Sequence, residues 1–131
     1  MKQKLTLLAV ILTLVVSGCA AFDELSHKGA YQDTTKAYAS SMRWSDFDTA
    51  KLLVKQPNLP GPDVLKNIKI TTYDVKQHLV IQDGLRIRQL ASISYFKKSD
   101  MLLRTISVEE IWELNAEDNQ WYLTKGFPDF E

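Results

Sequence analysis

The sequence predicts an α+β domain in which helices pack on one face of an antiparallel sheet. Between Ala30 and Val54, apolar residues recur every three or four positions, which is the spacing of amphipathic helices. After Asn67 they alternate with polar residues in segments separated by turn signals, which is typical of hairpin-connected strands. Because the helical segments come first and the strands follow, we expect the helices to cover one face of the sheet.

The start of the chain has the organisation of an export signal. Lys2 and Lys4 precede the uncharged, mostly apolar run Leu5–Val16, and Ser17-Gly18 then leads to Cys19. This order is that of a bacterial secretory signal peptide, and the run is shorter than the about 20 apolar residues of a spanning helix. The residues before Cys19 resemble a lipobox, which implies that the thiol is acylated and the chain cleaved before it. The alternatives are a buried cysteine or an intermolecular disulfide.

This organisation divides the chain into a signal peptide over 1–18, a lipid-anchored linker over 19–29 and a folded domain over 30–131. Ala20, rather than Asp, follows Cys19. By resemblance to enteric lipoproteins, this implies an outer-membrane protein that faces the periplasm. The expected partner is therefore the membrane, reached through several acyl chains, because one chain alone anchors a protein only marginally.

Charge and composition narrow the functions of the mature chain. Without Lys2 and Lys4, the chain has 14 basic and 16 acidic side chains with interspersed signs. We find no basic patch of the kind that binds phosphates, so we do not expect nucleic acid as a partner. If Cys19 carries lipid, the domain contains no disulfide and depends on packing, for which 3 Trp, 5 Tyr and 5 Phe are available.

Two helices are expected before the sheet. The first covers Ala30 to about Arg43 and has one stripe formed by Tyr31, Thr34, Tyr38 and Met42. Ser45 is a suitable N-cap for a second, shorter helix. Its buried side contains Phe47, Ala50, Leu53 and Val54. Pro57 ends this helix, and the turn residues Asn58–Pro62 lead to the sheet.

Four strands are expected after this turn. In the first, Ile68, Ile70 and Thr72 share one face, and a change of parity near Tyr73 predicts a bulge before Val75, Leu79 and Ile81. Asp83-Gly84 predicts a hairpin turn. The second strand places Leu85, Ile87, Gln89, Ala91, Ile93 and Tyr95 on one face. The third places Leu102, Arg104, Ile106, Val108, Glu110, Trp112 and Leu114 together. The last strand covers Gln120–Thr124, and a tail begins at Gly126.

Three segments resemble the nuclear-transport-factor-2-like superfamily, also called cystatin-like or SnoaL-like. They are Tyr31…Tyr38, Arg43–Ala50, and Ile111-Trp112-Glu113-Leu114 with Gln120-Trp121-Tyr122-Leu123. The resemblance covers Ala30 to Phe127 and implies a cone in which a curved antiparallel sheet wraps around helices. It implies no single activity, because this fold hosts isomerases, dehydratases and non-catalytic modules.

Glu110 is the leading candidate for a functional side chain. It shares a predicted face with Ile106, Val108 and Trp112, and a carboxylate in apolar surroundings has a raised pKa. We therefore expect it to be buried against the helices. The candidate pocket residues are Tyr38, Tyr73, Gln89, Tyr95, Arg104, Glu110 and Trp112. The alternative is that Glu110 and Arg104 form a structural ion pair across the sheet.

Other arrangements of reactive side chains carry less information. Asp74 and His78 could act as an acid and a base. They are four residues apart and share a strand face only if the strand is regular, an assumption that the predicted bulge near Tyr73 undermines. The alternative is that the two side chains are hydrogen-bonded elsewhere or exposed to solvent. The two histidines, His27 and His78, give no set with the spacing of zinc ligands. The sequence contains no phosphate-binding loop or nucleophile elbow. We expect no metal and no cofactor.

Three functions remain open at this point. The first, which we favour because no catalytic motif is present, is a lipid-anchored, non-catalytic interaction module. Its partner would be an envelope protein or a second copy, met partly by the apolar tail around Phe127 and Phe130. The second is a periplasmic binder of a small apolar ligand. The third is an isomerase or dehydratase with Glu110 or Asp74 as its base.

Overall fold

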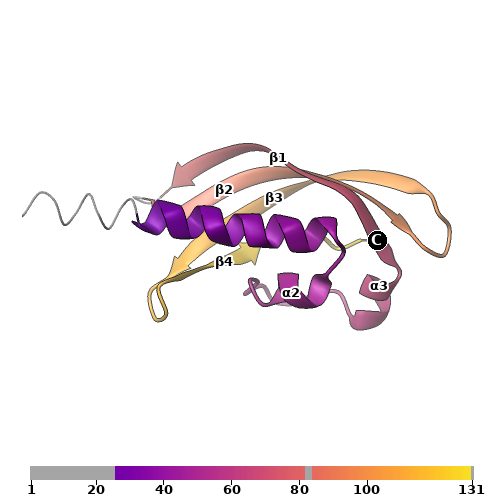
Figure 1. Ribbon diagram of the computed structural model, residues 1–131, viewed down its shortest axis with the longest axis horizontal. Helices are drawn as coiled ribbons and strands as arrows, with labels where there is room; N and C mark the ends of the chain where they lie inside the picture. The colour runs from indigo at the N-terminus through magenta and orange to yellow at the C-terminus, as the bar shows by residue number, and fades with distance from the viewer. Residues whose placement is uncertain (1–25, 82–83, 131) are drawn as a thin grey trace, which may run out of the picture.

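The structure, a computed structural model, describes residues 26–81 and 84–130, and all its helices lie on one side of a curved antiparallel sheet (Figure 1). Residues 26–43 are helical and are called the N-terminal helix. The other elements are α2 (Phe47–Lys51), α3 (Pro62–Lys66), β1 (Ile68–Ile81), β2 (Arg86–Lys97), β3 (Leu103–Asn115) and β4 (Gln120–Lys125). The four strands have the order β1-β2-β3-β4, so β1 and β4 form the edges.

The N-terminal helix buries the stripe that its sequence pattern predicts. Tyr38 and Met42 are fully buried and Ala39 nearly so, while Tyr31 packs against the same core. The helix also includes residues 26–29, which we had expected to belong to the linker, so that boundary is wrong. Trp121 explains the difference, because its Nε1 donates a hydrogen bond to the His27 carbonyl at 3.1 Å. The remainder of the predicted linker, 19–25, and the signal peptide lie outside the described residues.

The second helix begins one residue later than predicted and ends earlier. Asp46, not Ser45, is the N-cap, and its Oδ1 accepts the Thr49 N–H at 3.2 Å. The Ser45 backbone is left-handed (φ 57°), and its Oγ accepts the Ile70 N–H at 2.9 Å. Ser45 thus satisfies an outward-facing amide of edge strand β1 instead of capping a helix.

The segment between α2 and β1 also differs from the expectation. Leu53 and Val54 are not helical, and Val54 forms a parallel bridge with Leu123 of β4. The last residue of the predicted turn, Pro62, is the first residue of a short helix, α3, which was not expected from the sequence. Proline suits this position because its missing N–H would have no partner in the first helical turn.

The predicted irregularity of β1 is confirmed. Pairing with β2 shifts between Ile70 and Thr72, so that Ile70 and Tyr73 both point into the core and Thr72 is exposed. A second shift follows between Val75 and Gln77. The core position predicted for Val75 is wrong, as is that for Leu79, because the second half of this edge strand is exposed on both faces. Part of the predicted turn, 82–83, lies outside the described residues.

The central strands follow the predicted alternation closely. In β2, every second residue from Ile87 to Tyr95 is buried, as predicted. Of the residues predicted for this face, only Leu85, which precedes the strand, is half exposed. In β3, Glu110 and Trp112 are buried on the predicted face, whereas Leu102, before the strand, is 62% exposed. Ile111 on the opposite face is also buried, at the register shift where β3 begins to pair with β4.

The tail after β4 is part of the core, so the prediction of an exposed apolar contact surface is wrong. Phe127 and Phe130 are 5% and 3% exposed. The Phe130 ring lies 5.6 Å from that of Phe47 and 5.0 Å from that of Tyr95, both nearly perpendicular. Edge-to-face geometry of this kind is favourable for aromatic pairs. The sequence shows the aromatic residues of the tail but not the gap between α2 and the sheet that they fill.

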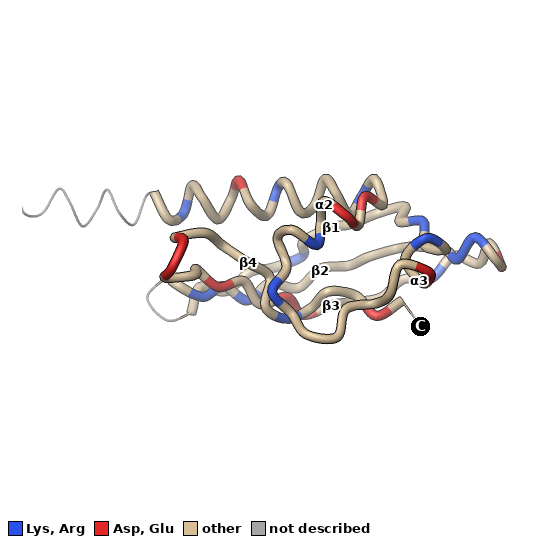
Figure 2. Tube along the Cα trace, turned by 90° about the horizontal axis from the view of Figure 1, so that it is seen from below, with Lys and Arg blue, Asp and Glu red and all other residues tan. Residues whose placement is uncertain are grey.

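Charged residues of both signs are interspersed over the described chain (Figure 2), which agrees with the sequence. The helices in the described ranges are all too short or too polar to cross a membrane.

Candidate functional site

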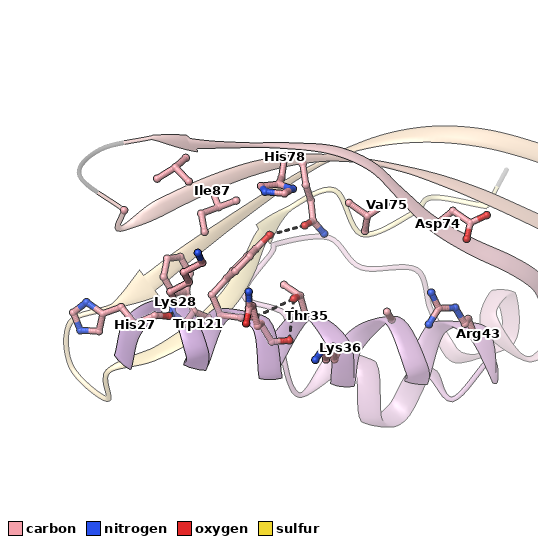
Figure 3. Close-up of a pocket in the computed structure, with 16 residues that line it drawn as sticks. His27, Lys28, Thr35, Lys36, Arg43, Asp74, Val75, His78, Ile87 and Trp121 are labelled. Carbon is pink, nitrogen blue, oxygen red and sulfur yellow. Dashed lines mark hydrogen bonds between the residues drawn. The ribbon is translucent and has the colours of Figure 1, made fainter. Parts of the chain in front are cut away.

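A cavity of about 880 Å³ lies between the N-terminal helix and strands β1 and β2 (Figure 3). We call it the helix–sheet cavity. Tyr31 and Thr35 line it from the helix, Ile87 and Gln89 from β2, and Trp121 from β4. Its volume lies within the range of about 300–1,000 Å³ that is typical of small-molecule sites.

The helical repeat explains which side chains reach the cavity. Tyr31, Thr35, Ala39 and Arg43 are spaced by four residues, and residues at this spacing lie above one another on one helix face. Thr35 is held by its own helix, because its hydroxyl donates to the Tyr31 carbonyl at 2.9 Å. The cavity wall on the helix side is therefore a direct consequence of the periodicity.

Glu110 lies behind the cavity wall and is fully buried. Its Oε1 accepts hydrogen bonds from Gln89 Nε2 at 2.6 Å and from the Tyr73 hydroxyl at 2.8 Å. The Tyr73 hydroxyl also lies 3.0 Å from Oε2. A buried carboxylate is stable only where such donors compensate for lost hydration, so Gln89 and Tyr73 belong with Glu110 as one polar unit.

A hydrogen-bonded chain connects this buried unit to the cavity. The Tyr31 hydroxyl donates to Gln89 Oε1 at 2.7 Å, and the amide of Gln89 in turn donates to Glu110. Tyr31 and Gln89 line the cavity, whereas Glu110 and Tyr73 do not. Gln89 thus stands between the carboxylate and any molecule in the cavity, and its bond to Tyr31 is one of the dashed contacts in Figure 3.

Burial determines how these groups titrate. It raises the pKa of Glu110 to about 7, although the hydrogen bonds from Gln89 and Tyr73 lower it. The indole of Trp112 also lowers this pKa, but its Nε1 makes no hydrogen bond of standard geometry to any described residue. Burial, followed by the charge of Glu110, raises the pKa of Tyr31 to about 12 and that of Tyr38 well above its ordinary value. Both tyrosines therefore keep their hydroxyl protons at neutral pH, while Glu110 exists in both protonation states.

The predicted pocket residues fall into two groups. The structure places Tyr38, Tyr73, Gln89, Glu110 and Trp112 near one another. The ring of Tyr38 lies 5.9 Å from that of Tyr73 and 5.2 Å from that of Trp112. Of the seven residues predicted to line a pocket, only Gln89 lines the helix–sheet cavity.

Tyr95 and Arg104 do not belong to this group. Tyr95 packs on Phe130, and Arg104 donates to Asp100 Oδ1 at 3.0 Å. The alternative of an ion pair between Arg104 and Glu110 is therefore wrong, because residue 104 lies six positions along the strand, near the β2–β3 turn. An even spacing along a strand predicts that two residues share a face of the sheet, but it does not predict that they lie close together on that face.

Sequence reasoning did not identify the residues that line most of the cavity. Asp74 and His78 do line it, but Asp74 is exposed and lies 4.0 Å from Lys76. The rings of Tyr31 and Trp121 lie 5.3 Å apart. Tyr31 was expected only on the stripe of the first helix, and Trp121 only in the last strand. The four-residue spacing that begins at Tyr31 is the available signal for the helix wall. This spacing does not show that a cavity separates the helix from strands β1 and β2.

Comparison with known proteins identifies the fold but no family. No family model matches the chain, and no curated protein matches it. A crystal structure from Xanthomonas campestris pv. campestris, described as a "putative polyketide cyclase", is similar over 78% of this chain and 93% of its own. The TM-score is 0.51 and the identity 12%, so the likeness shows the fold alone. The predicted α+β, nuclear-transport-factor-2-like fold is confirmed.

Proposed function

We propose that this domain is a non-catalytic binder of a small, mainly apolar molecule, which it holds in the helix–sheet cavity. The observation that carries the proposal is the cavity itself, whose lining combines apolar side chains such as Ile87 and Trp121 with polar ones, among which Gln89 is hydrogen-bonded on two sides. A concave site with apolar walls, in which fixed polar groups orient the ligand, is the usual form of small-molecule sites. The amide of Gln89 is held on both sides, by Tyr31 and Glu110, and so presents a preorganised surface.

The geometry favours binding over catalysis. A general base must come within hydrogen-bond reach of the substrate proton, yet Glu110 is enclosed and Gln89 separates it from the cavity. The burial of Phe127 and Phe130 also removes the apolar tail surface that partly supported the interaction-module hypothesis. The description of the structural neighbour as a cyclase is compatible with a fold that encloses an organic molecule, and an isomerase or dehydratase remains the second candidate because the pKa of Glu110 is raised.

The binding proposal is tested by titration with N-phenyl-1-naphthylamine, a neutral dye that fluoresces in apolar sites. Gln32 lines the cavity and is exposed, so Gln32→Trp should obstruct it and weaken dye binding by about tenfold or more. Asp33→Trp is the matched control, since Asp33 is the next exposed residue and does not line the cavity. A wild-type protein that shows no saturable binding, or equal loss in both variants, contradicts the proposal.

Glu110→Gln separates the two candidate functions. A binder keeps its dye affinity within about threefold, because Gln can still occupy the site behind Gln89. An acid–base enzyme loses about 10²-fold or more in rate once a substrate is known.

We further propose that the mature protein is anchored in the bacterial envelope through lipid on Cys19, in the outer membrane on its periplasmic side. The support is the order of Lys2, Lys4, Leu5–Val16 and Cys19, which lie outside the described residues. Intact-mass measurement of protein extracted with mild detergent should show a cleaved, acylated N-terminus. Cys19→Ser should abolish the acyl mass and release the protein from membranes; unchanged processing and attachment would contradict the anchor.

A further inference from the structure

The helix–sheet cavity is asymmetric in charge. The N-terminal helix contributes three basic side chains to its lining: Lys28, Lys36 and Arg43. The opposite wall contributes one carboxylate, Asp74, from β1. Figure 3 shows the three basic residues on the helix and Asp74 with Val75 and His78 on the strand above it. The cavity therefore has a cationic side and a mainly apolar side.

Helical spacing produces this arrangement. Lys28, Lys36 and Arg43 are separated by about two helical turns each, so they follow one face of the helix. Tyr31 and Ala39 lie between them on the same lining surface. Basic and apolar side chains thus alternate along the wall of one cavity.

Two of these cations have no acidic partner within the described residues. Arg43 is engaged, because its Nε and Nη2 donate to the Tyr73 carbonyl at 3.2 and 3.0 Å. Lys28 and Lys36 form no ion pair with any residue in 26–81 or 84–130. Within the described residues, Asp74 forms its ion pair with Lys76, at 4.0 Å, and not with Lys28 or Lys36. Two lysine ammonium groups are left available to a ligand.

We propose that the ligand is an amphiphile with an acidic head group, such as a carboxylate on an alkyl chain. This inference rests on the proposed binding function and adds the ligand's charge. The head group lies against Lys28 and Lys36, and the chain lies against Val80, Ile87 and Trp121. Lys28 and Lys36 are exposed at the edge of the cavity, so an anion beside them gains a modest electrostatic energy, while the alkyl chain gains by leaving water. A neutral ligand of the same length gains only the second.

The test compares decanoate with decanol, which share a chain length and differ in head group. Both displace N-phenyl-1-naphthylamine at pH 8 and low ionic strength, below micelle-forming concentrations. We expect decanoate to bind about tenfold more tightly than decanol. In the double variant Lys28→Gln/Lys36→Gln the ratio should fall to about one. Lys98→Gln, a lysine away from the cavity, should leave the ratio unchanged. The wild-type preference should also decrease in about 1 M salt.

The outcomes distinguish this inference from the function on which it rests. If the dye binds and decanoate displaces it no better than decanol, the acidic head group is wrong and the apolar-binding function stands. The acidic head group is equally wrong if the preference survives in Lys28→Gln/Lys36→Gln. If the dye itself does not bind, both proposals are overturned. Circular dichroism of the double variant shows whether it is folded, and decanol affinity equal to that of wild type shows that its cavity is intact.

Discussion

The two ends of the sheet have the same alternation of buried and outward-facing residues in β2, but one end is covered by packed side chains and the other borders a cavity. Near α2 and α3, the inward face of β2 ends at Tyr95, which Phe130 covers with a ring contact of 5.0 Å. Near the start of the N-terminal helix, the same face of β2 presents Ile87 and Gln89 to the helix–sheet cavity. We call these the closed end and the open end.

The difference lies in what covers the sheet and not in the sheet itself. At the closed end, the tail returns after β4 and places Phe127 and Phe130 beside Phe47. At the open end, the N-terminal helix alone faces the strands, and its side chains leave a space of about 880 Å³. Glu110 lies on β3 between the two regions and is satisfied from the open-end side by Gln89. The cavity therefore exists because the C-terminal tail covers only one end of the sheet and leaves the other end uncovered.

The largest expected effect is at the closed end. Phe130→Ala removes a buried ring that contacts Phe47, Phe127 and Tyr95, and it should lower the free energy of unfolding by about 3–5 kcal/mol. Urea denaturation followed by circular dichroism measures this change. Trp44→Ala is the control, because Trp44 is 77% exposed and its loss should change stability by only about 0.5 kcal/mol. Equal effects would mean that the tail does not close this end.

The next largest effect on stability is expected from Glu110, which lies between the closed end and the open end. The pKa of Glu110 is raised from 4.5 to about 7, so the folded protein keeps a proton that the unfolded chain has lost within this window. The free energy of unfolding therefore falls as the pH rises from about 4.5 to 7, by about 3 kcal/mol at 1.36 kcal/mol per pKa unit, and changes little from this group above pH 7.

Glu110→Gln removes this pH dependence, because an amide does not titrate. The stability of the variant relative to wild type should rise by about 3 kcal/mol between pH 4.5 and 7.5 in urea denaturation. Glu109→Gln is the matched control on the neighbouring position, since Glu109 is exposed and pairs with Arg88 at 3.2 Å. A parallel pH profile for wild type and Glu110→Gln would show that Glu110 is not the buried titrating group.

A smaller effect is expected where the tail leaves β4. Gly126 has a φ of +105°, and a Cβ there would lie 2.8 Å from the Glu110 Cα and closer still to the Glu109 carbonyl oxygen. Gly126→Ala should therefore lower stability by about 2 kcal/mol, through backbone strain and the enforced shift. Gly61→Ala is the control, because a Cβ at Gly61 meets nothing within 4 Å. A neutral Gly126→Ala would mean that the tail can leave β4 by another path.

Much of the fold could be predicted, because periodicity is a local property of the chain. The alternation in β2, the burial of Glu110 and the bulge near Tyr73 all follow from parity. The site could be predicted only in part, because it depends on distances between elements. Parity grouped Arg104 with Glu110, although they lie far apart along β3. The tail was expected to be exposed because the residues around Phe130 show no helix or strand periodicity from which its burial could be predicted.

The hydrogen bond from Trp121 to His27 joins residues 94 positions apart in the chain. The first described turn of the N-terminal helix therefore lacks this hydrogen bond until β4 has been synthesised. Loop closure over such a separation makes this a late step in folding. Until then, the apolar face around Tyr31 and Tyr38 is available to a chaperone, and folding completes only when almost the whole chain is present.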